Sequence, residues 1–318
     1  MYTAYYGLCE KPFRLTPDPR FHFLSASHRE ALAHVLYGID QGEGFIAVTG
    51  EVGTGKTTLC RTLIERVGPD TEIAFLFNPT LSPEELLRAI ALEFGLPVEG
   101  ASRAALGDAL NHFLLETNGR GRQVILIVDE AQNLAIETLE QLRLLSNLET
   151  ATAKLIQIVL FGQPELDDLL DSPKLRQLRQ RISVRWRLGS LTDAEAREYV
   201  RHRIRVAAAG DIDVFTPGAL REIRRRARGI PRLVNLLADR SLLAGYAEGA
   251  LRVDRGHVGR AAREILQARR ARRPRGRGWR RVTMGGVAVL CGLGALAGSP
   301  PPGPSPTPSV LETSEETP

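Results

Sequence analysis

The feature that most constrains the fold is a glycine-rich run of eight residues, Gly50–Thr57, which reads GEVGTGKT and fits the pattern G-x-x-x-x-G-K-[ST]. An apolar run over 45–48 precedes it, as expected of a buried strand, and a helix is expected over 56–67. Glycines let backbone N–H groups turn inward around phosphate oxygens, and the start of a helix adds partial positive charge there. The sequence therefore predicts a phosphate-binding loop, or P-loop.

The predicted ligands of this loop are ATP and Mg²⁺. Lys56 can reach the β- and γ-phosphates, and Thr57 can ligate magnesium. The residues expected to bind the nucleotide are contiguous: Gly50, Glu51, Val52, Gly53, Thr54, Gly55, Lys56, Thr57 and Thr58.

Two adjacent carboxylates follow the most strand-like run of the chain, 124–128. Ligands of open parallel sheets bind at the carboxyl ends of the strands, so Asp129 and Glu130 are expected beside the phosphates. Asp129 suits magnesium, usually through water, and Glu130 can orient or deprotonate an attacking water. The alternative is a solvated pair that caps a helix. The glutamate favours hydrolysis over phosphoryl transfer to a second substrate.

A polar amide, Gln163, follows the apolar run 155–161. At the end of a neighbouring strand, this side chain is expected beside the γ-phosphate, where it could position water. The alternative is that Gln163 caps the helix that starts near Pro164.

Three arginines lie close together just before the last expected strand: Arg176, Arg179 and Arg181. An arginine that reaches into a neighbouring subunit's site would stabilise transition-state charge. Arg181 is the first candidate for this role and Arg176 the second, and the alternative is a solvated helix face.

Arg232 lies in the first turn of an expected helix that follows Gly229. A positive charge is electrostatically unfavourable at a helix N-terminus. This placement indicates a function, such as contact with the γ-phosphate, although an ordinary surface arginine is the alternative.

Apolar runs alternate with helical segments, which predicts an α/β fold with a parallel five-stranded sheet covered on both faces. Ser27, with Glu30 three residues on, is expected to cap the helix that ends near Ile39, and Ser82 with Glu85 is a second capping box. After Leu191 only helices are expected, in a small all-α lid. The expected strands are 45–48, 73–77, 124–128, 155–161 and 182–188, and the lid helices are 192–208, 217–227, 231–244 and 253–267.

The basicity of the chain is local. The formal net charge is +5, but residues 260–281 hold ten Arg and one Glu, a net +9, which leaves −4 for the remainder. The apolar run that follows is expected to be a single transmembrane helix flanked by positive charge, with a flexible apolar tail as the alternative. The expected segments are 1–40 (N-terminal, at the nucleotide site), 41–188 (ATPase core), 189–268 (lid), 269–281 (basic linker), 282–298 (transmembrane helix) and 299–318 (Pro-rich tail).

The cysteines and the N-terminus bear on the compartment. The three cysteines are scattered and form no metal-ligand or disulfide pattern, which fits a reducing compartment. No signal peptide is recognisable at the N-terminus, so the bulk of the chain is expected to stay where it is made.

Taken together, these motifs resemble the AAA+ ATPases and, more narrowly, the general secretion pathway protein A (ExeA-type) family. The resemblance covers about residues 1–265. It is carried by Tyr5–Leu8, Pro12–Phe13, Leu15–Pro19, His28–Leu32, Asp129–Leu134, Gly162–Leu166 and Leu175–Leu178.

The resemblance implies a cytoplasmic ATPase, often membrane-anchored, that serves assembly of a secretion, pilus or exopolysaccharide-export machine. It also implies that Pro17–Phe21 packs near the adenine. The implied roles are phosphate and magnesium binding for Lys56 and Thr57, hydrolysis for Asp129 and Glu130, sensor 1 for Gln163, arginine finger for Arg181 and sensor 2 for Arg232.

One departure separates this sequence from secretion members of the family, which carry a sizeable periplasmic peptidoglycan-binding domain. Here only about twenty residues follow the expected span. Direct cell-wall binding is therefore not expected, and an exopolysaccharide- or pilus-associated relative is the better comparison.

Two functions remain open on the sequence. The first is an envelope-assembly ATPase, a homo-oligomer in the inner membrane with its ATPase in the cytoplasm and inner-membrane secretion or assembly proteins as partners. The second is a DNA-associated AAA+ ATPase of the transposition or loader type, in which residues 260–281 grip phosphates. The first is favoured because the basic block adjoins an apolar run, which makes lipid headgroups the simpler partner. Nucleic acid stays open as a partner.

Overall fold

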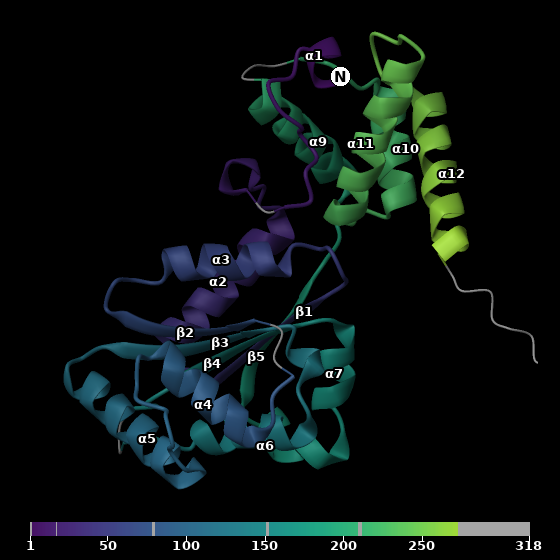
Figure 1. Cartoon of the computed structure of the whole chain (residues 1–318). Coiled ribbons are helices and arrows are strands. Elements are labelled where there is room, and N and C mark those ends of the chain that lie inside the picture. The colour runs from purple at the N-terminus through teal and green to yellow at the C-terminus, as the bar shows by residue number, and fades with distance from the viewer. Residues whose placement is uncertain (1, 17, 78–79, 151–152, 209–211, 273–318) are drawn as a thin grey trace, which may run out of the picture. The chain divides into compact units, whose positions relative to one another are not determined.

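Five parallel strands form one sheet in the order β2-β3-β4-β1-β5 (Figure 1), which confirms the predicted sheet. This computed structural model describes residues 2–16, 18–77, 80–150, 153–208 and 212–272, with side chains through residue 267. The strands are β1 (Phe45–Gly50), β2 (Thr71–Phe77), β3 (Gln123–Asp129), β4 (Gln157–Gly162) and β5 (Ile182–Leu188).

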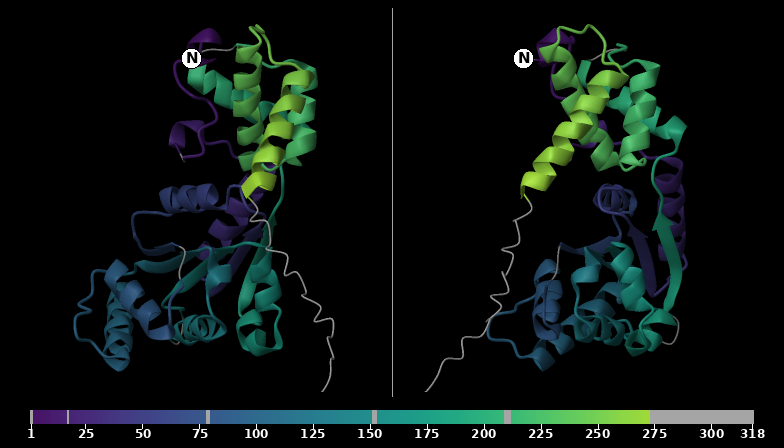
Figure 2. Two further views of the ribbon diagram at one scale, coloured as in Figure 1. Left: turned by 45° about the vertical axis from the view of Figure 1, so that its right-hand side comes forward. Right: turned by 90° about the vertical axis from the view of Figure 1, so that its right-hand side faces the viewer.

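Helices cover both faces of the sheet (Figures 1 and 2) because side chains of both faces are apolar along the central strands. In β3, Ile125 and Ile127 pack on the side of α2 and α3, whereas Leu126 and Val128 pack on the side of the other four helices. The first layer is α2 (Ala26–Asp40) and α3 (Lys56–Arg66), and the second is α4 (Pro83–Glu93), α5 (Arg103–Gly119), α6 (Ile136–Leu145) and α7 (Pro164–Leu170).

The start of α2 differs from the prediction. The N-cap is Ser25, whose Oγ accepts from the backbone N–H of His28 at 3.3 Å, so the prediction of Ser27 as the cap was wrong. The Oγ of Ser27 instead accepts from the backbone N–H of Gly189 at 3.0 Å. Either serine can cap a helix, and a tertiary contact decides between them. The capping box of Ser82, by contrast, is present as predicted.

A helical lid follows β5. Its four helices begin within two residues of the predicted positions, but α11 and α12 end three and five residues later than predicted. Its apolar core includes Tyr2, Tyr6, Phe13 and Phe21, so the N-terminal segment packs with the lid. The buried guanidinium of Arg203 donates to the carbonyl of Pro12 and strengthens this attachment. The lid helices are α9 (Asp193–Ala208), α10 (Pro217–Ala227), α11 (Pro231–Ala247) and α12 (Arg255–Arg272), and the short elements are α1 (Tyr2–Tyr5), η1 (Pro19–Phe21), η2 (Ala131–Asn133), η3 (Pro173–Leu175) and α8 (Arg176–Arg179).

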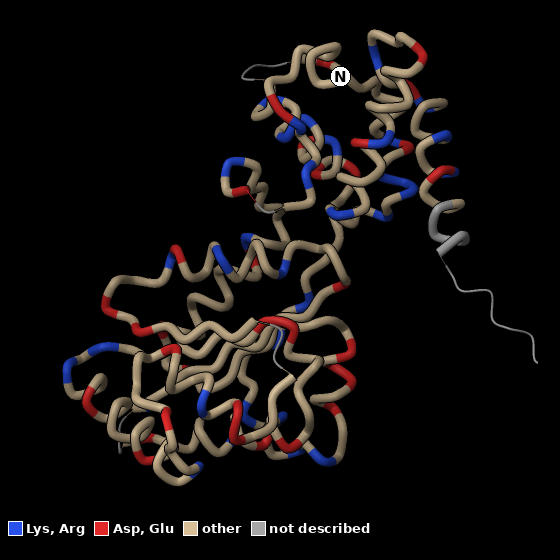
Figure 3. Tube along the Cα trace, in the orientation of Figure 1, with Lys and Arg blue, Asp and Glu red and all other residues tan. Residues whose placement is uncertain are grey.

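The expected membrane span and basic block fall largely outside the described residues. Within the part of the chain that is described, no helix is both long and apolar enough to cross a membrane. Residues 282–298 and the tail 299–318 lie outside that part, as does most of the linker 269–281, of which 269–272 continue α12. Along the described chain, basic and acidic residues are intermixed on the helices and loops of core and lid (Figure 3).

Candidate nucleotide-binding site

The P-loop connects β1 to α3, and two of its glycines are required by geometry. Gly53 and Gly55 have φ values of +84° and +104°, which side-chain-bearing residues rarely adopt. A Cβ on Gly53 would lie 2.5 Å from the Cβ of Arg232, and one on Gly55 would lie 2.6 Å from Nε2 of His28. The loop is therefore held between the lid on one side and α2 on the other.

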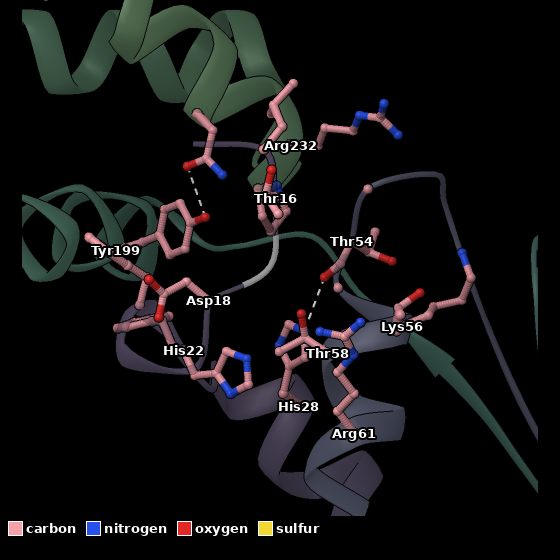
Figure 4. Close-up of a pocket in the computed structure, with 18 of the residues that line it drawn as sticks. Thr16, Asp18, His22, His28, Thr54, Lys56, Thr58, Arg61, Tyr199 and Arg232 are labelled. Atoms are coloured by element: carbon pink, nitrogen blue, oxygen red, sulfur yellow. Dashed lines mark hydrogen bonds between the residues drawn. The ribbon is translucent and has the colours of Figure 1, made fainter. Parts of the chain in front are cut away.

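A pocket of about 540 Å³ opens beside this loop (Figure 4). The P-loop side is lined by Val52 through Thr58, which includes most of the residues predicted to bind phosphate. The opposite wall comes from the N-terminal segment and the lid, and includes Thr16, Asp18, Phe21, His22, Tyr199 and Arg203.

Lys56 is buried at the loop, where its Nζ donates to the carbonyl oxygens of Gly50 at 2.7 Å and Glu51 at 3.3 Å. Burial lowers the pKa of Lys56, and the nearby carboxylates of Glu130 and Asp129 oppose that shift. These carboxylates therefore favour the charged form of the lysine at the place where phosphate oxygens would bind.

Asp129 ends β3 and contacts the first turn of α3. Its Oδ2 accepts from Oγ1 of Thr57 at 2.8 Å, and its side chain is completely buried. Burial raises the pKa of Asp129, whereas the hydrogen bonds from Thr57 and from the backbone of Glu130 lower it. Thr57 and Asp129 are the two residues that the sequence assigns to magnesium, and the structure places them in contact.

The donor set at Thr57 and Asp129 fits Mg²⁺. The hydroxyl and the carboxylate are oxygen ligands, which magnesium prefers, and the ion commonly takes its remaining ligands from substrate phosphates and water. Among the described residues, no group of three or more His, Cys, Asp or Glu could hold a metal ion. When magnesium is bound here, Thr57 and Asp129 would supply the protein oxygens that hold it.

Glu130 is held in a specific orientation at the mouth of the pocket. Its backbone is left-handed, with φ 56° and ψ 37°, a conformation that costs energy for a residue with a side chain. Its Oε2 accepts from Nε2 of Gln132 at 2.6 Å and from Nε2 of Gln163 at 2.9 Å. Burial favours the protonated acid, but these two hydrogen bonds and the charge of Lys56 bring the pKa of Glu130 below its ordinary value. The carboxylate is therefore ionised at neutral pH.

Gln163 occupies the N-cap position of α7, yet its side chain makes no capping hydrogen bond. The amide reaches Glu130 instead, so the capping alternative is not what the structure contains. Gln132 was missed by sequence reasoning. Its Oε1 accepts from the backbone N–H of Gln163 at 2.9 Å, which links the ends of β3 and β4. The signal in the sequence was an amide residue two positions after Glu130.

Arg232 and Arg181, the predicted sensor and the first candidate for the finger, lie at different places. Arg232 is exposed and lines the pocket, and its backbone N–H donates to the carbonyl of Gly53 at 3.2 Å. Arg181 precedes Ile182, which pairs with Phe45 at the start of β1. Arg181 therefore lies at the amino-terminal ends of the strands, whereas the P-loop follows the carboxyl end of β1. Its Nη1 is 3.4 Å from Oγ of Ser146. Arg181 therefore does not enter the site of its own chain.

The fold and this site define a P-loop nucleotide-binding protein of the AAA+ class. A family model described as "AAA domain" matches residues 39–170. More narrowly, the chain belongs with the AAA+ ATPases of the general secretion pathway protein A type. It is 46% identical over 266 residues to General secretion pathway protein A of Aeromonas hydrophila, an alignment that covers 83% of this chain and 48% of the relative. This chain thus spans about half of that relative's length.

Solved structures with a similar fold include Cdc6p of Pyrobaculum aerophilum (21% identity, TM-score 0.60), which matches over 80% of this chain and 70% of its own. The ORC1 protein of Aeropyrum pernix in complex with DNA (20% identity, TM-score 0.59) matches over 83% and 71%. The RuvB branch migration motor of Thermotoga maritima (19% identity, TM-score 0.52) matches over 78% and 73%. At these identities the similarity concerns the fold alone.

Proposed function

We propose that the chain hydrolyses ATP in a magnesium-dependent reaction. The observation that carries this proposal is the carboxylate of Glu130, which two amide side chains orient beside a P-loop that contains Lys56. An ionised and fixed carboxylate at this position is a suitable acceptor for the proton of an attacking water. No second hydroxyl substrate is needed for this chemistry.

Each residue of the site has a separate task in this proposal. Backbone N–H groups of the loop and Nζ of Lys56 bind the phosphates, and Thr57 and Asp129 orient the magnesium site. Bound magnesium would supply positive charge at the phosphate oxygens. Glu130 orients a water and takes its proton, while Gln163 keeps the carboxylate in place.

Glu130→Gln tests the chemistry. We expect ATP binding to be retained and turnover to fall by about 10²- to 10³-fold, because the amide cannot accept the proton. Binding is measured by calorimetry and turnover by phosphate release. Glu137→Gln, an exposed position seven residues on, is the matched control. If Glu130→Gln hydrolyses ATP as fast as wild type, Glu130 does not accept the proton of the attacking water.

We further propose that the active form is a homo-oligomer. Arg181 lies away from its own nucleotide pocket and half-buried, as a finger that acts on a neighbouring subunit would. Arg232 contacts the P-loop through its backbone and is proposed to report the state of the γ-phosphate to the lid.

The proposed cellular role is assembly of a secretion, pilus or exopolysaccharide-export system at the inner membrane, with the ATPase in the cytoplasm and inner-membrane assembly proteins as partners. The 46% identity to a general secretion pathway protein supports it. The proposed anchor is residues 282–298, next to the basic residues 269–281. Membrane fractionation of the full chain and of a version ending at residue 267 tests the anchor. Identical behaviour of the two without detergent would refute it.

The DNA-associated alternative gains no support from the ORC, Cdc6 and RuvB structures, because that similarity concerns the fold alone. Binding of a DNA duplex that falls steeply with salt and requires residues 260–281 would favour it.

A further inference from the structure

A buried histidine lies directly under the P-loop. His28, in the first turn of α2, is 3% exposed, and its Nε2 is 3.0 Å from the carbonyl oxygen of Thr54 (Figure 4). Its Nδ1 is 2.6 Å from Oγ of Ser25. A carbonyl oxygen only accepts, so Nε2 carries a proton. Burial lowers the pKa of His28 and favours the neutral ring, in which Nδ1 accepts from the Ser25 hydroxyl. The ring is thus fixed at both nitrogens with its N–H directed at the loop.

The peptide that His28 contacts controls an N–H group of the loop. In a planar trans peptide the carbonyl oxygen of Thr54 and the N–H of Gly55 point in opposite directions. A hydrogen bond that holds the carbonyl toward His28 therefore turns the Gly55 N–H to the other side of the loop. Gly55 has φ +104° and no side chain to resist rotation of this peptide. A flipped peptide would present a carbonyl oxygen where the loop needs a donor for phosphate.

We infer that His28 is a positioning residue for nucleotide binding, which locks the Thr54–Gly55 peptide in the orientation that binds phosphate. The close approach supports this, since a Cβ on Gly55 would lie 2.6 Å from Nε2. The inference rests on the proposed nucleotide-binding role of the P-loop. In this inference His28, which also lines the pocket, acts through the Thr54–Gly55 peptide and not on the reacting atoms.

The same turn of α2 is attached to the lid. The backbone N–H of Ala26 donates to Oε1 of Glu195 at 2.7 Å, and that of Gly189 donates to Oγ of Ser27 at 3.0 Å. The other oxygen of Glu195 accepts from the backbone and side chain of Thr192, at the start of α9. These contacts fix the helix turn that positions His28 to the segment that leads into the lid.

Two substitutions at position 28 test the role of the ring N–H donor separately from the role of the ring's volume. His28→Leu fills the space and removes the N–H. His28→Gln places an N–H as many bonds from Cβ as Nε2 of histidine. Both variants remove the ring nitrogen that accepts from the Ser25 hydroxyl. We expect His28→Leu to weaken binding of ADP and of a non-hydrolysable ATP analogue about tenfold, from the loss of one buried hydrogen bond and an unsatisfied carbonyl. His28→Gln should bind within about threefold of wild type.

The controls distinguish positioning from folding. Without nucleotide, His28→Leu should unfold only a few degrees below His28→Gln, by about the one buried hydrogen bond that distinguishes them. His34→Leu, an exposed position on the same helix, should bind nucleotide as wild type does. If His28→Gln and His28→Leu bind nucleotide equally weakly, the inference is wrong. It is also wrong if His28→Leu binds nucleotide as tightly as wild type. If the wild-type protein binds no nucleotide, both the proposed function and this inference fail. If the wild-type protein binds nucleotide but the variants do not differ as described, only this inference fails.

A second measurement applies even where His28→Leu fails to fold. In ¹⁵N-labelled wild-type protein, the ring of His28 should be neutral near pH 7, with the proton on Nε2. A proton on Nδ1 instead, or a charged ring, would contradict the geometry on which the inference depends.

Discussion

The contact between the P-loop and the lid predicts a large effect for a very small substitution, Gly53→Ala. The new methyl group would lie 2.5 Å from the Cβ of Arg232, whereas carbon atoms in ordinary contact are about 3.5–4.0 Å apart. The first turn of α11 must therefore retreat by about 1 Å or more. That movement breaks the 3.2 Å hydrogen bond from the N–H of Arg232 to the carbonyl of Gly53.

The magnitude has two parts. A left-handed backbone costs a residue with a Cβ about 1–2 kcal/mol, and φ of Gly53 is +84°. The lost hydrogen bond adds about 0.5–1.5 kcal/mol. Gly121→Ala is the matched control, because Gly121 has φ +73° but nothing within 4 Å of an added Cβ. Gly121→Ala therefore incurs only the backbone cost, without the loss of a hydrogen bond.

The assay is thermal unfolding with and without MgADP. For a chain of this size, 1 kcal/mol lowers Tm by roughly 2–4 °C, so Gly121→Ala should lose about 2–8 °C. Gly53→Ala should lose more, and nucleotide should no longer raise its Tm, because both the loop and the lid wall of the pocket have moved. Equal Tm values and equal nucleotide shifts in the two variants would show that the lid does not press on the loop.

Three further outcomes are expected. Arg181→Ala should lower oligomer-dependent ATP turnover by about 10³-fold while Arg176→Ala does not, and equal turnover in both would leave Arg181 an ordinary surface residue. Gln163→Ala should raise the pKa of Glu130 and lower the turnover number with little change in ADP affinity, as steady-state kinetics and calorimetry would measure. Hydrogen bonds from Arg225 and Arg226 lower the pKa of Glu222 from 4.5 to about 2. Glu222→Gln should therefore lower the free energy of unfolding at pH 7 by about 2 kcal/mol, a value reduced because the guanidinium groups are partly exposed. That difference should persist above pH 4.5 and disappear as the pH falls toward 2; a pH-independent difference in urea unfolding would contradict it.

The sequence was sufficient to predict the position of site residues that belong to one short segment. The P-loop glycines, Lys56 and Thr57 follow from a contiguous motif, and Asp129 and Glu130 follow from the end of an apolar run. Strand order was not needed for those predictions, because parallel strands bring their carboxyl ends to one edge.

The sequence was insufficient where a side chain is assigned by a contact between distant segments. Gln163 could have capped its own helix. Its amide instead contacts Glu130, which is 33 residues earlier in the sequence, and only the fold shows that the two residues are close. His28 has no motif of its own, and its partner Thr54 is 26 residues away. Ser25 and Ser27 are both acceptable caps, and the approach of Gly189 assigns Ser27 to a different donor.

The arrangement of these contacts supports the proposal that the lid senses the state of the loop. The chain crosses between core and lid twice, before α2 and after β5, and Ser27 with Gly189 joins the two crossings. The P-loop lies between them, touching α2 through His28 and α11 through Gly53. On the proposed function, we expect a displacement of the loop on binding phosphate to be transmitted to both attachments of the lid. Because the N-terminal segment packs in the lid's own core, that segment is expected to move with the lid.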